Sequence, residues 1–178
     1  MKKYSKPTIE TISIGNVSII CASHGKAHNS SFTSNQQTPY IPKEVKDLYS
    51  GITMKQKAAA MNLMMVLGGS CPPTPACISE INKIMTFAGQ SMGISGAEYK
   101  SYTDSFGGVR GMINELKSIH DKGVLDSLFL SFFSVVSVAK SEQALTALLN
   151  IYSEFGYTEE DCLEIIEKTE ALSRMFAK

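Results

Sequence analysis

LFLSFFSVVSVA, residues 128–139, is the longest apolar run in the chain, and the expected fold is built around it. Its 12 residues fall well short of the roughly 20 that cross a bilayer as a helix. Because a helix that is apolar on nearly every side must be surrounded by other helices, this segment predicts a buried central helix at roughly Val124 to Ala139. Ser131, Ser134 and Ser137 recur every three residues, a spacing that favours close helix packing and hydroxyl bonds to carbonyls one turn back.

Helix start and stop signals surround this segment from residue 43 onward. Ser95-Gly96-Ala97-Glu98 has the S-x-x-E form, in which a hydroxyl and a carboxylate each satisfy a free backbone N–H. Thr74 followed by Pro75 is typical of a helix N-terminus. The expected helices run roughly from Thr53 to Leu67, Thr74 to Gly93, Ser95 to Gly107, Val109 to His120 and Val124 to Ala139, with two more after Ser141 and Thr158. The predicted fold class is therefore all-α, a compact bundle of about seven helices within residues 43–178.

A faint internal repeat suggests that the bundle has pseudo-twofold character. SMGISGAEY at residues 91–99 aligns with EFGYTEEDC at residues 154–162, an offset of 63 residues. Each segment is a helix end in glycine followed by a capped helix. Two similar helical units packed face to face would produce this pattern.

Residues 1–42 differ from the rest of the chain in composition and are expected to form an N-terminal tail and linker. Residues 22–42 are polar and show no apolar period, which indicates a linker. The Gly15-Asn16 pair separates two β-prone runs and is a signal for a small β-hairpin at roughly residues 8–21. Two strands alone are marginal in water, so such a hairpin would need the helical body or the sheet edge of a partner.

Charge and cysteine usage narrow the class of protein. Seventeen basic and 17 acidic side chains cancel, so no global field favours nucleic acid or an anionic membrane as a partner. The acidic side chains near the C-terminus are interpreted as a solvated helix face, with an acidic docking surface as the alternative.

Four cysteines without a C-x-x-C pair do not form a disulfide scaffold, and Pro7 and Glu10 interrupt the apolar stretch that a secretory signal needs. We therefore expect a cytoplasmic protein with no membrane insertion.

A serine-hydrolase signature occurs at residues 89–93, where Gly-Gln-Ser-Met-Gly matches G-x-S-x-G. That elbow needs a strand directly before the serine, whereas residues 78–88 predict a helix. His120 is the only histidine downstream. We interpret Ser91 as part of a helix C-terminus and keep a nucleophilic Ser91 as an alternative. His120-Asp121 is expected to close the preceding helix, where a histidine meets the negative end of the helix dipole.

Cysteine and histidine also form two weak candidate sites. Cys21, His24 and His28 have C-x2-H-x3-H spacing, and their sulfur and imidazole groups suit zinc or copper. Because three ligands on a tail make a weak site, we interpret them as incidental and predict no metal or other cofactor. Cys71 and Cys77 flank a proline-rich loop and would close a disulfide under oxidation only if their α-carbons came within about 7 Å. We interpret this loop as ordinary, with a redox role as the alternative.

Roughly residues 53–170 resemble the TerB-like helical domains, named for tellurite-resistance proteins. The resemblance rests on NLMMVLGG at residues 62–69, on the helix that ends in GIS at residues 93–95, and on the second pass through residues 131–162. It implies an all-α bundle of about seven helices. The family places an Asp-Gly pair after each long apolar helix, with a downstream Glu, and associates these acids with divalent metal. This chain has Gly68-Gly69-Ser70 and Lys140-Ser141 there, so it lacks that acidic set.

Three functions follow from these observations. The first is a non-enzymatic protein-interaction module of unknown partner, linked to stress response if the TerB resemblance holds. The second is a leader-bearing or tail-processed carrier recognised through residues 1–28, because MKKYSKPTIE resembles the start of leader-bearing bacterial proteins. The third is a serine hydrolase that depends on Ser91. The first is the prediction we adopt.

Overall fold

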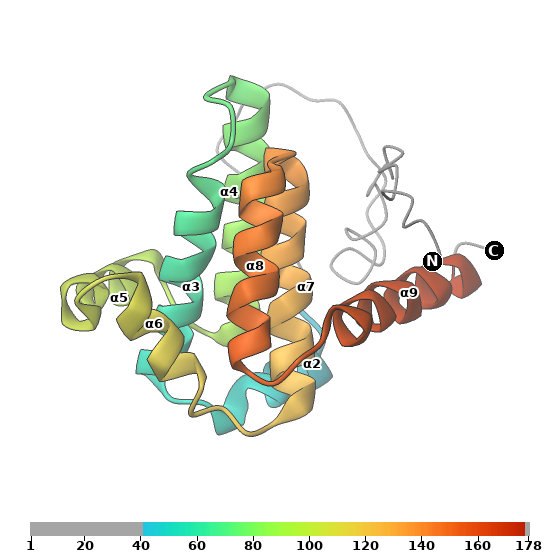
Figure 1. Cartoon of the computed structure of the whole chain (residues 1–178). Coiled ribbons are helices and arrows are strands. Elements are labelled where there is room, and N and C mark those ends of the chain that lie inside the picture. Colours follow the sequence, from blue (N-terminus) through green and yellow to red (C-terminus); the bar gives the residue numbers. More distant parts are fainter. Residues whose placement is uncertain (1–40, 177–178) are drawn as a thin grey trace, which may run out of the picture.

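The computed structural model describes residues 41–176, and side chains through residue 171; within these ranges all regular structure is helical (Figure 1). The α-helices are α2 (Lys43–Leu48), α3 (Met54–Gly68), α4 (Pro75–Met92), α5 (Gly96–Ser101), α6 (Val109–Leu116), α7 (Lys122–Ala139), α8 (Glu142–Glu154) and α9 (Glu159–Phe176). Two 3-10 turns, η1 (Tyr49–Gly51) and η2 (Thr103–Phe106), complete the described elements. The predicted all-α class is confirmed. The candidate hairpin at residues 8–21 lies outside the described part of the chain.

Helix α7 is the centre of the bundle, as its apolar sequence predicts. It contacts α3, α4, α8 and α9, and its Phe129, Phe132 and Val135 side chains are completely buried. The hydroxyls of Ser131 and Ser134 donate to carbonyls one turn back, as the serine spacing predicts. Among the described helices, α7 alone has the length and apolar content of a membrane span, but half of it is buried inside the protein.

Four helices form two antiparallel pairs that pack side by side, α3 with α4 and α7 with α8. Figure 1 shows α3 and α4 beside α7 and α8, with α5 and α6 on one side and α9 extending away on the other. α2 lies at the base. Asn62 on α3 connects the first pair to the α5–η2 segment, because its side chain donates to the Tyr99 carbonyl and accepts from the Thr103 hydroxyl. One continuous apolar core therefore runs from η1 to α9.

Most helix boundaries coincide with the predicted capping signals. The Thr53 hydroxyl accepts from the backbone N–H of Gln56, and the Gln56 side chain accepts from the Thr53 N–H, which completes a capping box before α3. Thr74 and Ser141 cap α4 and α8 in the predicted places. α4 ends at Gly93, whose left-handed backbone (φ 67°) glycine adopts without steric cost.

The two segments of the internal repeat have the same local geometry. Each contains a glycine of positive φ, and two residues later a serine or threonine that caps the next helix. The hydroxyl of this capping residue accepts a hydrogen bond from the backbone N–H of the acidic residue three positions further on. The carboxylate of that acidic residue in turn accepts from the backbone N–H of the capping residue. The equivalent pairs are Gly93 and Gly156, Ser95 and Thr158, and Glu98 and Asp161. The repeat therefore marks the starts of α5 and α9.

Two predicted helix ends are wrong, and one helix was missed. The helix predicted from Ser95 to Gly107 ends at Ser101 and continues as η2, and α2 was not predicted at all. α6 ends at Leu116 rather than at His120. The Asp121 carboxylate accepts from the backbone N–H of Val124, so Asp121 caps the start of α7 and does not close α6. His120 consequently lies in the loop between the two helices, and its predicted interaction with a helix C-terminus is wrong.

Candidate functional site

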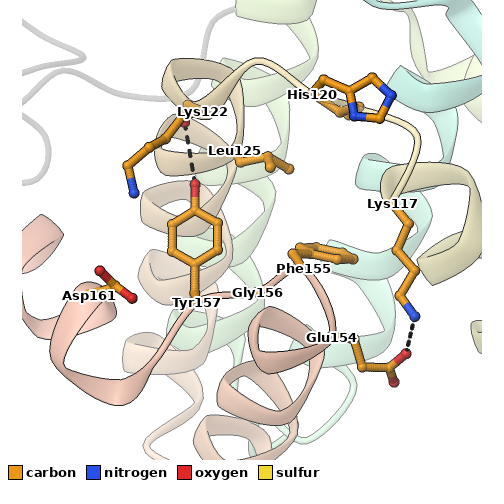
Figure 2. A pocket seen from close by; sticks show the side chains of 10 residues that line it. Lys117, His120, Lys122, Leu125, Glu154, Phe155, Gly156, Tyr157 and Asp161 are labelled. Carbon is orange, nitrogen blue, oxygen red and sulfur yellow. Dashed lines mark hydrogen bonds and ion pairs between the residues drawn. The ribbon is translucent and has the colours of Figure 1, made fainter.

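An open hollow of about 550 Å³ lies where the α6–α7 loop meets the α8–α9 loop (Figure 2). Its apolar floor is formed by Ile119, Leu125, Phe155 and Tyr157, of which only Phe155 is more than marginally exposed. Its rim carries basic side chains, which come from the segment between the end of α6 and the first turn of α7. The basic lining residues are Lys117, His120 and Lys122, and the acidic ones are Glu154 and Asp161.

An aromatic cluster holds the floor rigid. The completely buried ring of Tyr152 on α8 packs edge-on against Phe155 and Tyr157, at centroid separations of 5.2 and 5.3 Å. Gly156 between them has a φ of 88°, a backbone conformation that favours glycine and that reverses the chain after α8. The turn therefore places two successive aromatic side chains against the same buried ring.

Tyr157 is fixed from several directions. Its hydroxyl donates to the Asp126 carboxylate at 2.7 Å, and the Lys122 ammonium lies 4.5 Å from its ring centroid. Burial, together with the hydrogen bond to Asp126, raises the pKa of Tyr157 well above its usual value. The phenol consequently stays protonated at neutral pH and anchors the α8–α9 loop to α7.

Glu154 closes the other side of the hollow with two ion pairs. Its carboxylate oxygens lie 2.6 Å from Arg110 Nη1 and 2.7 Å from Lys117 Nζ. The hydrogen bond from Lys117, with the further hydrogen bond from Arg110, lowers the pKa of Glu154 in spite of partial desolvation. Glu154 is therefore ionised at neutral pH, and the three charged groups together carry one excess positive charge.

Asp161 contributes the remaining carboxylate, and it too is engaged. It accepts hydrogen bonds from the backbone N–H and the hydroxyl of Thr158, both at 2.8 Å. The hydrogen bond from the Thr158 backbone N–H has the larger effect, and together with the one from the hydroxyl it lowers the pKa of Asp161. Both carboxylates of the hollow are bound within the protein. Lys117, His120 and Lys122 are its exposed basic side chains, of which Lys117 is paired with Glu154 and Lys122 lies over the Tyr157 ring.

The pH dependence of stability should report the Glu154 ion pairs. Because the folded protein lowers the pKa of Glu154, the stabilisation is present above the ordinary glutamate value and is lost as pH falls through the folded-state value. We expect Glu154→Gln to flatten the acid side of a profile of urea midpoint against pH. Glu160→Gln is the matched control, since Glu160 is exposed on α9 and forms no ion pair within the described part of the chain. Parallel acid limbs for Glu154→Gln and the unmodified chain would contradict the assignment.

A second, smaller hollow of about 290 Å³ separates α7 from the first turns of α9. Leu130 and Ile165 line it together with Asp126, and Lys168 at its edge is paired with Glu164 at 2.7 Å. Two lysines, Lys122 and Lys168, stand against three carboxylates in this hollow, those of Asp126, Asp161 and Glu164. The first hollow has two lysines and His120 with two carboxylates, so it is the less acidic of the two.

The structure does not support the geometry that a nucleophilic Ser91 requires. Ser91 is in the last turns of α4 with 4% of its surface exposed, and its hydroxyl has no hydrogen-bond partner among the described residues. The residues before it are helical, as predicted, and not a strand. His120 is exposed in the α6–α7 loop and forms no hydrogen bond with the Ser91 hydroxyl. The elbow that would activate this serine is therefore not formed.

Two other sets of candidate residues have different outcomes. The candidate metal ligands Cys21, His24 and His28 lie outside the described residues. Cys71 and Cys77 are brought together, with their sulfur atoms in bonding contact and their α-carbons 6.7 Å apart. Among residues 41–171, no group of three or more His, Cys, Asp or Glu side chains is arranged to hold a metal ion.

Sequence reasoning missed most of the hollow. His120 was singled out for another role, and Lys117, Lys122, Phe155 and Tyr157 were not considered. The available signal was the Phe155-Gly156-Tyr157 turn, since two aromatics around a glycine between two helices suggest an ordered connection.

Comparisons with known proteins add no assignment: no family model, no curated protein and no solved structure matches this chain. The resemblance to TerB-like domains accordingly stays a prediction.

Proposed function

We propose that the helical domain is a non-enzymatic protein-interaction module that binds an acidic segment of a partner protein in the hollow between the α6–α7 and α8–α9 loops. The observation that carries the proposal is the combination of a rigid apolar floor with a basic rim. Lys122 and His120 are exposed, the Lys122 ammonium lies over the Tyr157 ring, and Phe155 is half-buried beside them. A carboxylate of the partner would meet this rim, and an adjacent apolar side chain would cover Phe155.

The state of the other polar groups supports binding rather than chemistry. Glu154 is held ionised by its cationic partners, and Tyr157 is held protonated by burial and by Asp126. Neither group is poised to exchange a proton near neutral pH, which general acid–base catalysis requires. The hollow is also broad and open, which suits a peptide segment better than an enclosed small substrate.

We also propose that the bundle has the pseudo-twofold organisation that the internal repeat predicts. The repeated glycine turns before α5 and α9, and the two antiparallel pairs α3–α4 and α7–α8, support this arrangement. If the TerB resemblance holds, the module serves a stress-linked process without the family's acidic metal set. A partner that presents acidic groups would be consistent with the basic rim.

The test is a binding measurement with defined peptides. A fluorescein-labelled peptide that alternates Glu with Phe and Leu is titrated with the full chain and followed by fluorescence anisotropy, beside the same peptide with Gln in place of Glu. We expect the acidic peptide alone to bind, and Lys122→Glu to weaken it by about tenfold or more, as loss of one charge contact of about 1.4 kcal/mol implies. Glu is favourable in the first turn of a helix, so this variant should fold.

Lys100→Glu is the matched control, because Lys100 is an exposed lysine on α5, outside the hollow. It should leave the affinity unchanged. Equal binding of the acidic and amide peptides, or equal loss in the Lys100 and Lys122 variants, would overturn the assignment of the hollow. Absence of binding to either peptide would do the same.

A further inference from the structure

The loop between α3 and α4 lies at one end of the described bundle (Figure 1), with Cys71 in the loop and Cys77 in the first turn of α4. The sulfur atoms of Cys71 and Cys77 are in bonding contact, and the 6.7 Å between their α-carbons lies within the range that a disulfide spans. Both residues are partly exposed, and the loop residues between them are exposed. The pair therefore lies at the surface of the described bundle and not in its core.

We propose that Cys71 and Cys77 form a reversible thiol–disulfide pair that exchanges with low-molecular-weight disulfides of the glutathione class. The pair closes a loop of only a few residues, so it constrains the unfolded chain much less than a long-range crosslink would. The fold does not depend on it, because the apolar core surrounds α7 and leaves this loop outside. The site is thus suited to a change of redox state that leaves the bundle intact.

The local backbone assigns different roles to the two sulfurs. Cys77 lies in the first turn of the 18-residue helix α4, where its N–H donates to the N-cap Thr74 hydroxyl. The positive end of a helix dipole favours a thiolate there, which makes Cys77 the attacking group. Cys71 precedes the helix and is positioned to resolve the mixed disulfide. The Cys77 sulfur also lies 3.7 Å from the Val138 carbonyl oxygen, and a hydrogen bond from the thiol to this acceptor favours the neutral form and works against the dipole in the reduced chain.

The exchange balances without any further reactant. The Cys77 thiolate attacks one sulfur of oxidised glutathione, an S–S bond of glutathione breaks, and the first glutathione leaves as a thiolate. The Cys71 thiolate then attacks the Cys77 sulfur of the mixed disulfide, and the second glutathione leaves. The two protons released by the cysteines are taken up by the two glutathione thiolates. The cysteine pair loses two electrons, and one molecule of oxidised glutathione gains them.

The third described cysteine provides an internal comparison. Cys162 on α9 is buried with 3% of its surface exposed, and desolvation by burial, with neighbouring acidic groups, raises its pKa to about 11. Both properties suppress its reaction with a disulfide. Cys162 should therefore stay reduced under conditions that oxidise the loop pair.

The experiment equilibrates the full chain in a series of glutathione buffers of increasing oxidised fraction, quenches it with an alkylating agent, and measures intact mass and a peptide map. We expect loss of two hydrogens per chain, a crosslink between the peptides of Cys71 and Cys77, and full reversal in reduced glutathione. Cys71→Ser should instead accumulate a single glutathionyl group on Cys77. Cys77→Ser should form the corresponding adduct on Cys71 about tenfold more slowly, because it lacks the helix N-terminus.

Three results would overturn the proposal. One is a pair that stays reduced throughout the series. Another is a crosslink of either loop cysteine to Cys21 in place of the Cys71–Cys77 bond. The last is a bond that persists in excess reduced glutathione, which would make it a permanent structural link. A far-UV circular-dichroism spectrum that is unchanged between the two redox states is part of the expected result, and loss of helix on reduction would count against it.

Discussion

Tyr152→Ala is expected to lower the free energy of unfolding by about 3–5 kcal/mol, the cost of removing a large aromatic side chain from a packed core. Tyr152 on α8 is completely buried, and its ring packs edge-on against Phe129 at 4.8 Å and against Phe155 and Tyr157. The cavity would open between α7, α8 and the turn that leads into α9. Urea unfolding followed by far-UV circular dichroism measures the loss.

Tyr152→Phe separates the ring from its hydroxyl. The hydroxyl donates to the Leu125 carbonyl at 2.8 Å inside the core, so its removal should cost only about 1–2 kcal/mol. If both variants lost the same amount, the hydrogen bond and not the packing would dominate. If Tyr152→Ala lost less than about 2 kcal/mol, the ring would not occupy the close-packed position described here.

Local signals were sufficient to predict most of the bundle. Thr53, Thr74 and Ser95 were identified as helix starts because an N-cap is a short-range interaction between a side chain and the next backbone N–H groups. Gly93 was identified as a helix end because a glycine C-cap is likewise a local feature of the backbone. The buried position of α7 followed from an apolar composition that exceeds what one exposed face permits.

Ambiguity arose where one residue could belong to either of two helices. Asp121 stands five residues after Leu116, the last residue of α6, and directly before α7. A carboxylate is unfavourable at the end of a helix and favourable at its start. Only the hydrogen bond to the Val124 N–H shows that it starts α7. The error about His120 came from the same source, since the histidine was assigned with its neighbour.

The hollow could not be predicted because it depends on contacts between distant segments. Phe155 becomes a floor residue only when the α6–α7 loop lies opposite it, about 35 residues earlier in the chain. Glu154 loses its expected role in an acidic face when Arg110 and Lys117 pair with it. Neither relation leaves a periodic or short-range trace in the sequence.

Gly111→Ala should be strongly destabilising, although alanine normally favours a helix over glycine by roughly 0.5–1 kcal/mol. Gly111 lies in the first turn of α6, where an added Cβ would stand 1.7 Å from the Phe106 carbonyl oxygen and 2.7 Å from its carbon. Backbone atoms cannot move aside as a flexible side chain can. Phe106 is itself buried in the core, so the η2 turn must be displaced as a whole. We expect a loss of about 3 kcal/mol in urea unfolding, at the upper end of overpacking costs.

Gly96→Ala is the matched control for this prediction. Gly96 also lies in the first turn of its helix, α5, but the nearest atom to an added Cβ is a Tyr99 ring carbon at 3.9 Å, an ordinary contact. That variant should be neutral or stabilised by up to about 1 kcal/mol. Opposite signs for the two substitutions would show that close approach of the Phe106 carbonyl, and not helix propensity, determines the residue at position 111. A stabilised Gly111→Ala would mean that η2 and α6 do not meet as the structure places them.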